Sequence, residues 1–140
     1  IGGRADWYIP ARDELELCWR NLKPTTTANY VTANRSTAAS FSYSNNGSYG
    51  DTANTHGTNN NSAPVGLTYT AESPAQTAAT AFRSGGTEAF EFGSTYYWSS
   101  SDYNATGAWI QYWSSSNPGN QGNNGKAGTF RVRAVRRSII

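Results

Sequence analysis

The first predicted element is an amphipathic helix near the start of the chain, in "ARDELELCWRNL". Its large apolar residues recur three or four positions apart, at Leu15, Cys18 or Trp19, and Leu22. This spacing places them on one face of a helix, with charged residues around the rest of the wheel. Asp13 and Glu14 fall in the first turn, where the helix dipole favours acids, and Pro24 follows the end. The pattern predicts a helix over Arg12 to Leu22, preceded by a short strand over 6–9, "DWYI".

A second helix is predicted in "SPAQTAATAFRSGG". Ser73 is a suitable N-cap, Pro74 suits the first helical position, and the body is rich in alanine. Gly85 or Gly86 would form the C-cap.

Three strands are predicted in the last third of the chain, where β-branched and aromatic residues cluster between turn-rich spacers. They are "STYYWSSS" (94–101), "GAWIQYW" (107–113) and "TFRVRAVR" (129–136). Two short helices followed by an antiparallel sheet indicate an α+β fold.

Alternation along the strands separates two faces of the predicted sheet. In the middle strand one face carries Trp109, Gln111 and Trp113, and the other carries Ala108, Ile110 and Tyr112. In the last strand we expect Phe130, Val132 and Ala134 to be buried. Arg131 and Arg133 would then project to the opposite side and pair with Glu88, Glu91 or Asp102.

Residues 25–70 differ in composition from the rest of the chain. They contain small clusters of Thr, Ala, Ser, Asn and Gly around four isolated aromatic residues: Phe41, Tyr43, Tyr49 and Tyr69. A segment of this length without predicted elements is uncommon in a compact domain and is often functional. We interpret it as an ordered, loop-rich insertion, with partial mobility as the alternative.

The composition indicates one folded domain, 1–140, with many turns. Gly, Ser, Thr and Asn account for 60 of 140 residues, and aromatic residues make up 14%. The chain begins at Ile1 and contains no Met, so we expect it to be the C-terminal part of a longer polypeptide. No apolar run reaches the ~20 residues that span a bilayer, so membrane insertion is not expected.

The net charge of +2 does not indicate nucleic-acid binding. Four Arg residues lie within 131–140, but the rest of the chain has no basic stripe for phosphate contacts. The single cysteine, Cys18, cannot form an internal disulfide, and we expect it to be a buried apolar residue.

Catalytic motifs are not evident, and the chain is not predicted to be an enzyme. The single histidine, His56, lies in a turn-rich stretch, and no G-x-S-x-G elbow marks a nucleophile. Glu88 and Glu91 could form a glycosidase pair, but ion pairing with Arg is the favoured interpretation. No His, Cys or Asp spacing indicates a metal site, and no cofactor is expected.

Recognition is the function that the composition favours. From Tyr96 to Asn124 the chain is rich in Tyr, Ser, Gly and Asn, which binding loops prefer. Tyr supplies rigid contact area, while Ser and Asn supply adaptable hydrogen bonds. The Trp residues of this stretch are interpreted as core, and most of the spacer residues as surface.

Four stretches, taken in order, resemble a known family: "DWYIPARDELELCW", "YYWSSSDY", "AWIQYW" and "FRVRAVRRS". Together they resemble the C-type-lectin-fold domains of phage tail fibre tips and bacterial surface proteins. They are also similar to the variable proteins of diversity-generating retroelements and, more distantly, to the formylglycine-generating enzyme fold. The resemblance covers both ends and the last third of the chain.

This resemblance implies a C-type-lectin-like fold with two short helices, a twisted antiparallel sheet and long ordered loops. Trp98, Trp109 and Val132 would be scaffold, with the ligand face formed by the C-terminal strands and their loops. Carried onto this sequence, the ligand-binding positions are Tyr103, Asn104, Ala105, Thr106, Gly107, Ile110, Tyr112, Ser114, Ser115, Asn117, Asn120, Gln121, Asn123 and Asn124.

The calcium-binding signatures of lectins, E-P-N or Q-P-D with a downstream W-N-D, are absent, so calcium-mediated sugar binding is not implied. The enzyme branch uses cysteine chemistry, which Cys18 in the first helix does not match.

The favoured hypothesis is a receptor-binding tip of a phage tail fibre, located at the distal end of the virion's fibre. It would contact a bacterial cell-surface glycan or outer-membrane protein and would be trimeric through the rest of the fibre. The alternatives are a structural or trimerising cap, or a retroelement-diversified ligand binder on a bacterial surface.

Overall fold

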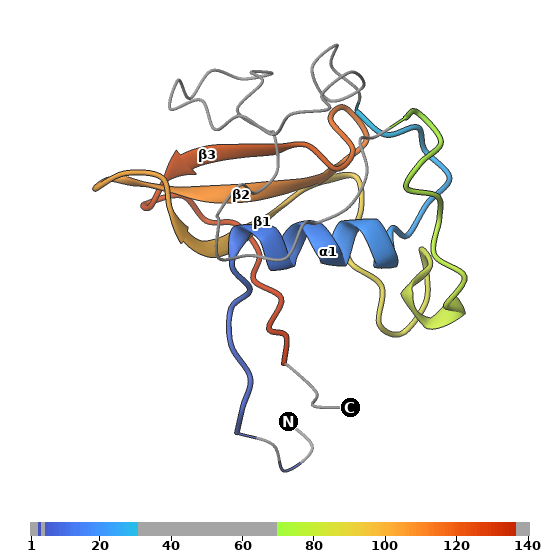
Figure 1. Cartoon of the computed structure of the whole chain (residues 1–140), viewed down its shortest axis with the longest axis horizontal. Coiled ribbons are helices and arrows are strands. Elements are labelled where there is room, and N and C mark those ends of the chain that lie inside the picture. The colour runs from blue at the N-terminus through green and yellow to red at the C-terminus, as the bar shows by residue number, and fades with distance from the viewer. Residues whose placement is uncertain (1–2, 4, 31–69, 137–140) are drawn as a thin grey trace.

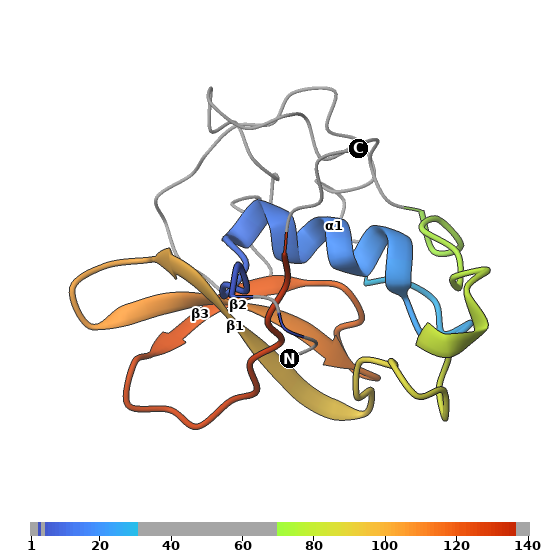
Figure 2. The ribbon, with the colours of Figure 1, turned by 90° about the horizontal axis from the view of Figure 1, so that it is seen from below.

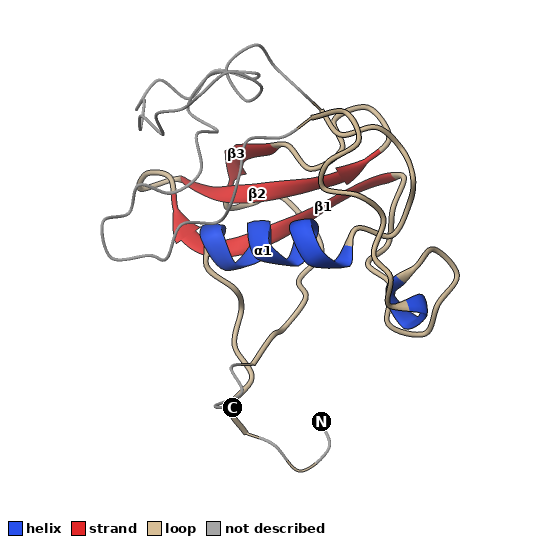
Figure 3. Cartoon of the chain, turned by 45° about the vertical axis from the view of Figure 1, so that its right-hand side comes forward, coloured by secondary structure: helices blue, strands red, loops and turns tan. Residues whose placement is uncertain are grey.

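The computed structural model describes residue 3, residues 5–30 and residues 70–136, and these form one α-helix packed on a three-stranded antiparallel sheet (Figures 1 and 3). The helix is α1, Arg12–Leu22, and the strands are β1, Ser94–Asp102, β2, Gly107–Ser114, and β3, Gln121–Gly125. The strand order is β1-β2-β3, with both pairs antiparallel. The predicted α+β class is therefore confirmed at this level. The isolated aromatic residues Phe41, Tyr43, Tyr49 and Tyr69 lie outside the described residues, as does His56.

Helix α1 has the predicted bounds, and its N-terminus is fixed by Glu14. The Ala11 backbone N–H donates to Glu14 Oε2 at 2.9 Å, and the Tyr8 hydroxyl donates to Glu14 Oε1 at 2.8 Å. The first of these bonds occupies a backbone donor that the start of the helix would otherwise leave unpaired, and the second holds the Glu14 carboxylate in place. Leu15 and Trp19 are buried against the sheet, as their spacing predicted.

The core lies between α1 and the face of the sheet that carries Trp113. The Trp113 side chain is fully buried, stacks on Phe90 at 4.0 Å between ring centroids, and meets Trp19 edge-on at 4.8 Å. Tyr97 also contacts this cluster. The prediction that Trp109 and Trp113 share the core face of β2 is confirmed.

Polar side chains are buried between α1 and the sheet, and they are joined to one another by hydrogen bonds. Gln111 Nε2 donates to Glu16 Oε2 at 3.0 Å and to the Gly119 carbonyl at 2.8 Å. Gln121 Nε2 donates to Gln111 Oε1 at 2.6 Å, and Arg12 Nε donates to Gln121 Oε1 at 2.7 Å. We call Arg12, Glu16, Gln111 and Gln121 the polar network; it connects α1 to β2 and β3.

The predicted second helix is wrong. Its sequence contains only a 3₁₀ turn, Thr80–Phe82, and Thr77 N–H instead donates to the Lys23 carbonyl at 2.9 Å. Alanine has a high helix propensity, but a short helix needs an apolar face to bury, and Phe82 is the one large apolar residue in this stretch.

The predicted strand over 129–136 is also wrong. This C-terminal segment is joined to the rest by two isolated bridges, Tyr97 with Arg131 and Tyr8 with Val135. The strand over 6–9 is likewise reduced to the bridge at Tyr8. Val132 was expected to be buried as scaffold, but it is 50% exposed, and Phe130 and Ala134, also expected to be buried, are half-buried. The segment does not form the regular strand from which their burial was predicted. The third strand of the sheet is β3, in a stretch that the sequence marked as a spacer.

Candidate functional site

The loop between β1 and β2 projects beyond the ends of these two strands (Figures 1 and 2). Asn104 fixes its shape, because Asn104 Oδ1 accepts hydrogen bonds from the backbone N–H groups of Thr106 at 3.0 Å and Gly107 at 2.7 Å. The Tyr103 and Asn104 N–H groups both donate to the Gly107 carbonyl. This Asx turn gives the loop a defined shape while leaving its side chains in solvent.

The exposed end of β3 lies beside this loop. Lys126 N–H donates to the Thr106 carbonyl at 2.9 Å, and Lys126 Nζ pairs with Asp102 at 2.8 Å. Tyr103 is half-buried, with its ring edge-on to Trp109 at 5.3 Å. We define the tip surface as the side chains that this arrangement displays: Tyr103, Asn104, Ala105, Thr106, Asn123, Asn124 and Lys126.

Several predicted ligand-binding residues are buried, and for these the expected exposure is wrong. Ile110 and Tyr112 are 2% and 1% exposed, and Tyr96 packs edge-on against Tyr112 at 4.7 Å between ring centroids. Alternation placed both residues correctly on the face opposite α1, but that face is not open to solvent at these positions. The others are Gly107, Ser114, Asn120 and Gln121, of which Gln121 belongs to the polar network.

Ser115 is exposed and Asn117 is half-buried, but both lie in the turn between β2 and β3. That turn is at the opposite end of β2 from the tip surface, roughly 23 Å away for a strand of this length. The predicted ligand-binding residues therefore lie at two opposite ends of β2, and a single ligand-binding surface can include only the exposed residues at one of these ends.

The predicted ion pairs of the C-terminal segment are confirmed for two of the three acids. Arg131 pairs with Glu91, and Arg133 pairs with Glu88 at 2.9 Å. Asp102 pairs with Lys126 instead. Each of the two glutamates is therefore engaged by an arginine, which is the ion-pairing interpretation that the sequence favoured.

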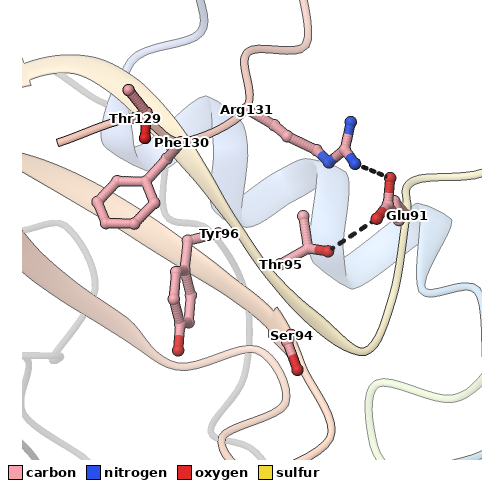
Figure 4. A pocket seen from close by; sticks show the side chains of 7 residues that line it. All are labelled: Glu91, Ser94, Thr95, Tyr96, Thr129, Phe130 and Arg131. Atoms are coloured by element: carbon pink, nitrogen blue, oxygen red, sulfur yellow. Dashed lines mark hydrogen bonds and ion pairs between the residues drawn. The ribbon is translucent and has the colours of Figure 1, made fainter.

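A cleft of about 450 Å³ that the sequence did not indicate lies beside the Glu91–Arg131 ion pair (Figure 4). The aromatic residues Tyr96 and Phe130 line its other side. The sequence signal was limited to Glu91, just before a predicted strand, and to Tyr96, Phe130 and Arg131 on two predicted strands whose order in the sheet was not predicted.

Within the part of the chain that the structure describes, no cluster of His, Cys, Asp and Glu could hold a metal ion. Cys18 is half-buried, and burial raises the pKa of its thiol from 9.0 to about 11; the Glu14 carboxylate adds to this increase and Arg133 opposes it. A thiol with this pKa is a poor nucleophile at neutral pH.

No family model, curated protein or solved structure matches this chain. Among the described helices, none has the length and apolar character that crossing a membrane requires.

Proposed function

We propose that this chain is a receptor-binding domain of C-type-lectin-like fold, carried at the distal tip of a phage tail fibre. Its partner is a bacterial surface glycan or protein, bound without a cofactor or metal. The observation that carries the proposal is the tip surface: an amide- and hydroxyl-rich loop held in one shape by Asn104 and presented beyond the ends of β1 and β2. The C-type-lectin-like assignment rests on the four sequence stretches and on the order of helix and antiparallel sheet.

Preorganisation is the physical reason that this surface suits binding. A loop already fixed by side-chain-to-backbone hydrogen bonds loses little conformational entropy when a partner binds. Tyr103 adds an aromatic surface whose orientation is set by Trp109. Such anchors contribute most of the affinity in interfaces of this kind.

The test is binding of the fluorescently labelled domain to a panel of bacterial strains. On a strain that binds, Ala105→Glu should weaken binding at least about 10-fold, which corresponds to about 1.4 kcal/mol. Ser115→Glu is the matched control, because it adds the same carboxylate to an exposed turn at the other end of β2. Equal effects of the two variants, or no binding to any strain, would exclude the tip surface as the receptor site.

A structural or trimerising cap is the second candidate, and exposed apolar side chains favour it. Trp7, Ile9, Leu17 and Val132 are between 37% and 50% exposed. Trp7 and Ile9 are two residues apart on an extended segment, so their side chains lie on the same side of it. A subunit interface could bury them. A retroelement-diversified binder on a bacterial surface would use the tip surface in the same way as the fibre tip.

A further inference from the structure

The cleft beside β1 is a second surface suited to binding, distinct from the tip surface. It lies at the start of β1, whereas the tip surface follows the end of that nine-residue strand, roughly 25 Å away. The residues that line it come from β1, from the C-terminal segment and from Glu91 just before β1, and backbone hydrogen bonds hold the two segments together. Arg131 N–H donates to the Tyr96 carbonyl at 3.0 Å, and Trp98 N–H donates to the Arg131 carbonyl at 2.9 Å. The cleft is therefore formed before any ligand arrives.

One wall of the cleft is aromatic. The rings of Tyr96 and Phe130 meet edge-on at 5.3 Å, with an interplanar angle of 90°, and both side chains are half-buried. Packing restricts them on their far sides, since Tyr96 contacts Tyr112 and Phe130 contacts Trp98. Such rings offer a firm apolar surface to the C–H face of a ligand.

The other wall is polar and carries the Glu91–Arg131 ion pair (Figure 4). Both side chains are 54% exposed, and Thr95 Oγ1 donates to Glu91 Oε1 at 3.5 Å. Ser94 and Thr129 add hydroxyl groups to the lining. A guanidinium has five N–H donors and a carboxylate accepts several hydrogen bonds, so the pair keeps both kinds of group available to a ligand.

The pairing determines which ligand class fits. Because Glu91 and Arg131 neutralise each other, the cleft has no net charge to attract an ion, and an ionic ligand would have to separate the pair. A neutral ring bearing hydroxyl groups requires no separation. It can place its C–H face on Tyr96 and Phe130 while its hydroxyls reach the charged pair at the edge.

We propose that this cleft binds a neutral pyranose saccharide, as a site separate from the tip surface. The volume of about 450 Å³ falls in the lower part of the range of small-ligand pockets, which suits one or two sugar rings. Glu91 is the one carboxylate among the residues lining the cleft. Glycoside hydrolysis generally needs two carboxylates, so the cleft holds a saccharide without cleaving it.

The test is titration of the ¹⁵N-labelled chain with neutral methyl pyranosides and disaccharides, followed by backbone amide chemical shifts. Saccharides would be added to about 20 mM, well above the roughly millimolar Kd expected for a small ligand on a half-exposed surface. At least one should shift the amides of Tyr96, Phe130 and Arg131. Glu91→Gln should weaken that binding at least about fivefold.

Glu88→Gln is the matched control, because it removes the carboxylate of a similar ion pair, with Arg133, that does not line the cleft. It should change the Kd less than about twofold. Phe130→Leu, which keeps an apolar side chain but removes the ring, should also weaken binding, with near-ultraviolet circular dichroism as the check on folding.

Three results would overturn the proposal: no saccharide shifts the cleft amides, Glu88→Gln weakens binding as much as Glu91→Gln, or a charged sugar acid or amino acid binds there in preference to the neutral rings. The two proposals fail separately. Ala105→Glu should leave saccharide binding in the cleft unchanged, and Glu91→Gln reports on the cleft whether or not the tip surface binds cells.

Discussion

At the scale of single residues, Gly119 is a position where the backbone lies directly against the core residue Trp19. Its φ is +78°, and a Cβ built there would overlap the indole ring of Trp19. Glycine adopts this positive φ without the steric cost that a Cβ would bring. The overlap with Trp19 was not visible from the sequence, since these residues are 100 positions apart.

We predict that Gly119→Ala destabilises the chain more than Gly85→Ala. Gly85 has a similar φ of +84° but open space around it, so alanine there costs only the backbone strain of about 1–2 kcal/mol. At Gly119 the methyl group also overpacks a buried ring, which adds about 1–3 kcal/mol. Urea denaturation of both variants measures the difference. Equal losses of unfolding free energy would show that Gly119 does not contact Trp19 as described.

Cys18 gives a prediction about reactivity. Between a pKa of 9.0 and one of about 11, the thiolate fraction at pH 8 falls about 100-fold, so alkylation of the native chain should be slower by about that factor than in urea. The raised pKa also stabilises the fold below pH 9, and this contribution is lost as the pH rises from 9 toward 11. Iodoacetamide labelling followed by mass spectrometry measures the rate, and equal rates in both states would contradict the burial of Cys18.

At the residue scale, the sequence predicted which face of the sheet a side chain lies on, but it did not predict whether other residues cover that face. Trp109 and Trp113 were correctly assigned to the core because alternation is a property of the strand itself. Alternation also separated Ile110 and Tyr112 from that face, but it carries no information about what packs on them. Their burial depends on residues elsewhere in the chain, such as Tyr96.

At the scale of elements, prediction succeeded where one segment carried its own pattern. Helix α1 has an apolar stripe and flanking signals, and its bounds were predicted correctly. Strand β3 has neither, since "QGNNG" lacks the β-branched and aromatic residues that favour strands. It forms because β2 offers it a hydrogen-bonding edge and because Gln121 joins the polar network. These causes are tertiary, so the local sequence could not reveal them.

The polar network predicts that Gln121 holds β3 to the helix. The Gln121→Leu substitution removes the acceptor of the Arg12 Nε hydrogen bond and the donor of the Gln111 Oε1 hydrogen bond, and both bonds are buried. It should lower the unfolding free energy by about 2–4 kcal/mol. Asn124→Ala is the control on the same strand, since Asn124 Oδ1 accepts a hydrogen bond from its neighbour Gly125 at the exposed end. Its cost should stay within about 0.5 kcal/mol. Chemical denaturation compares them, and a small loss for Gln121→Leu would contradict the network.

At the scale of the whole molecule, the described terminal segments run side by side, and the tip surface lies elsewhere. Tyr8 and Val135 exchange backbone hydrogen bonds of 2.9 Å, and both segments extend from the same side of the body (Figure 1). The loop that carries Ala105 projects from the end of the β1–β2 hairpin. This arrangement would let a fibre continue from the terminal segments while leaving the tip surface open to a partner.

The two candidate functions therefore predict different oligomeric states for the isolated chain. A fibre tip that is trimeric through the rest of the fibre should be monomeric as the isolated chain, because the four exposed apolar side chains among the described residues supply little of the roughly 1,000 Å² that a stable interface buries. Sedimentation velocity at micromolar concentration measures this. The structural cap would be favoured if the chain is a trimer that dissociates in Trp7→Ser or Ile9→Ser and stays intact in Ala105→Glu. The receptor-binding tip would be favoured if the chain is a monomer and cell binding is lost only in Ala105→Glu.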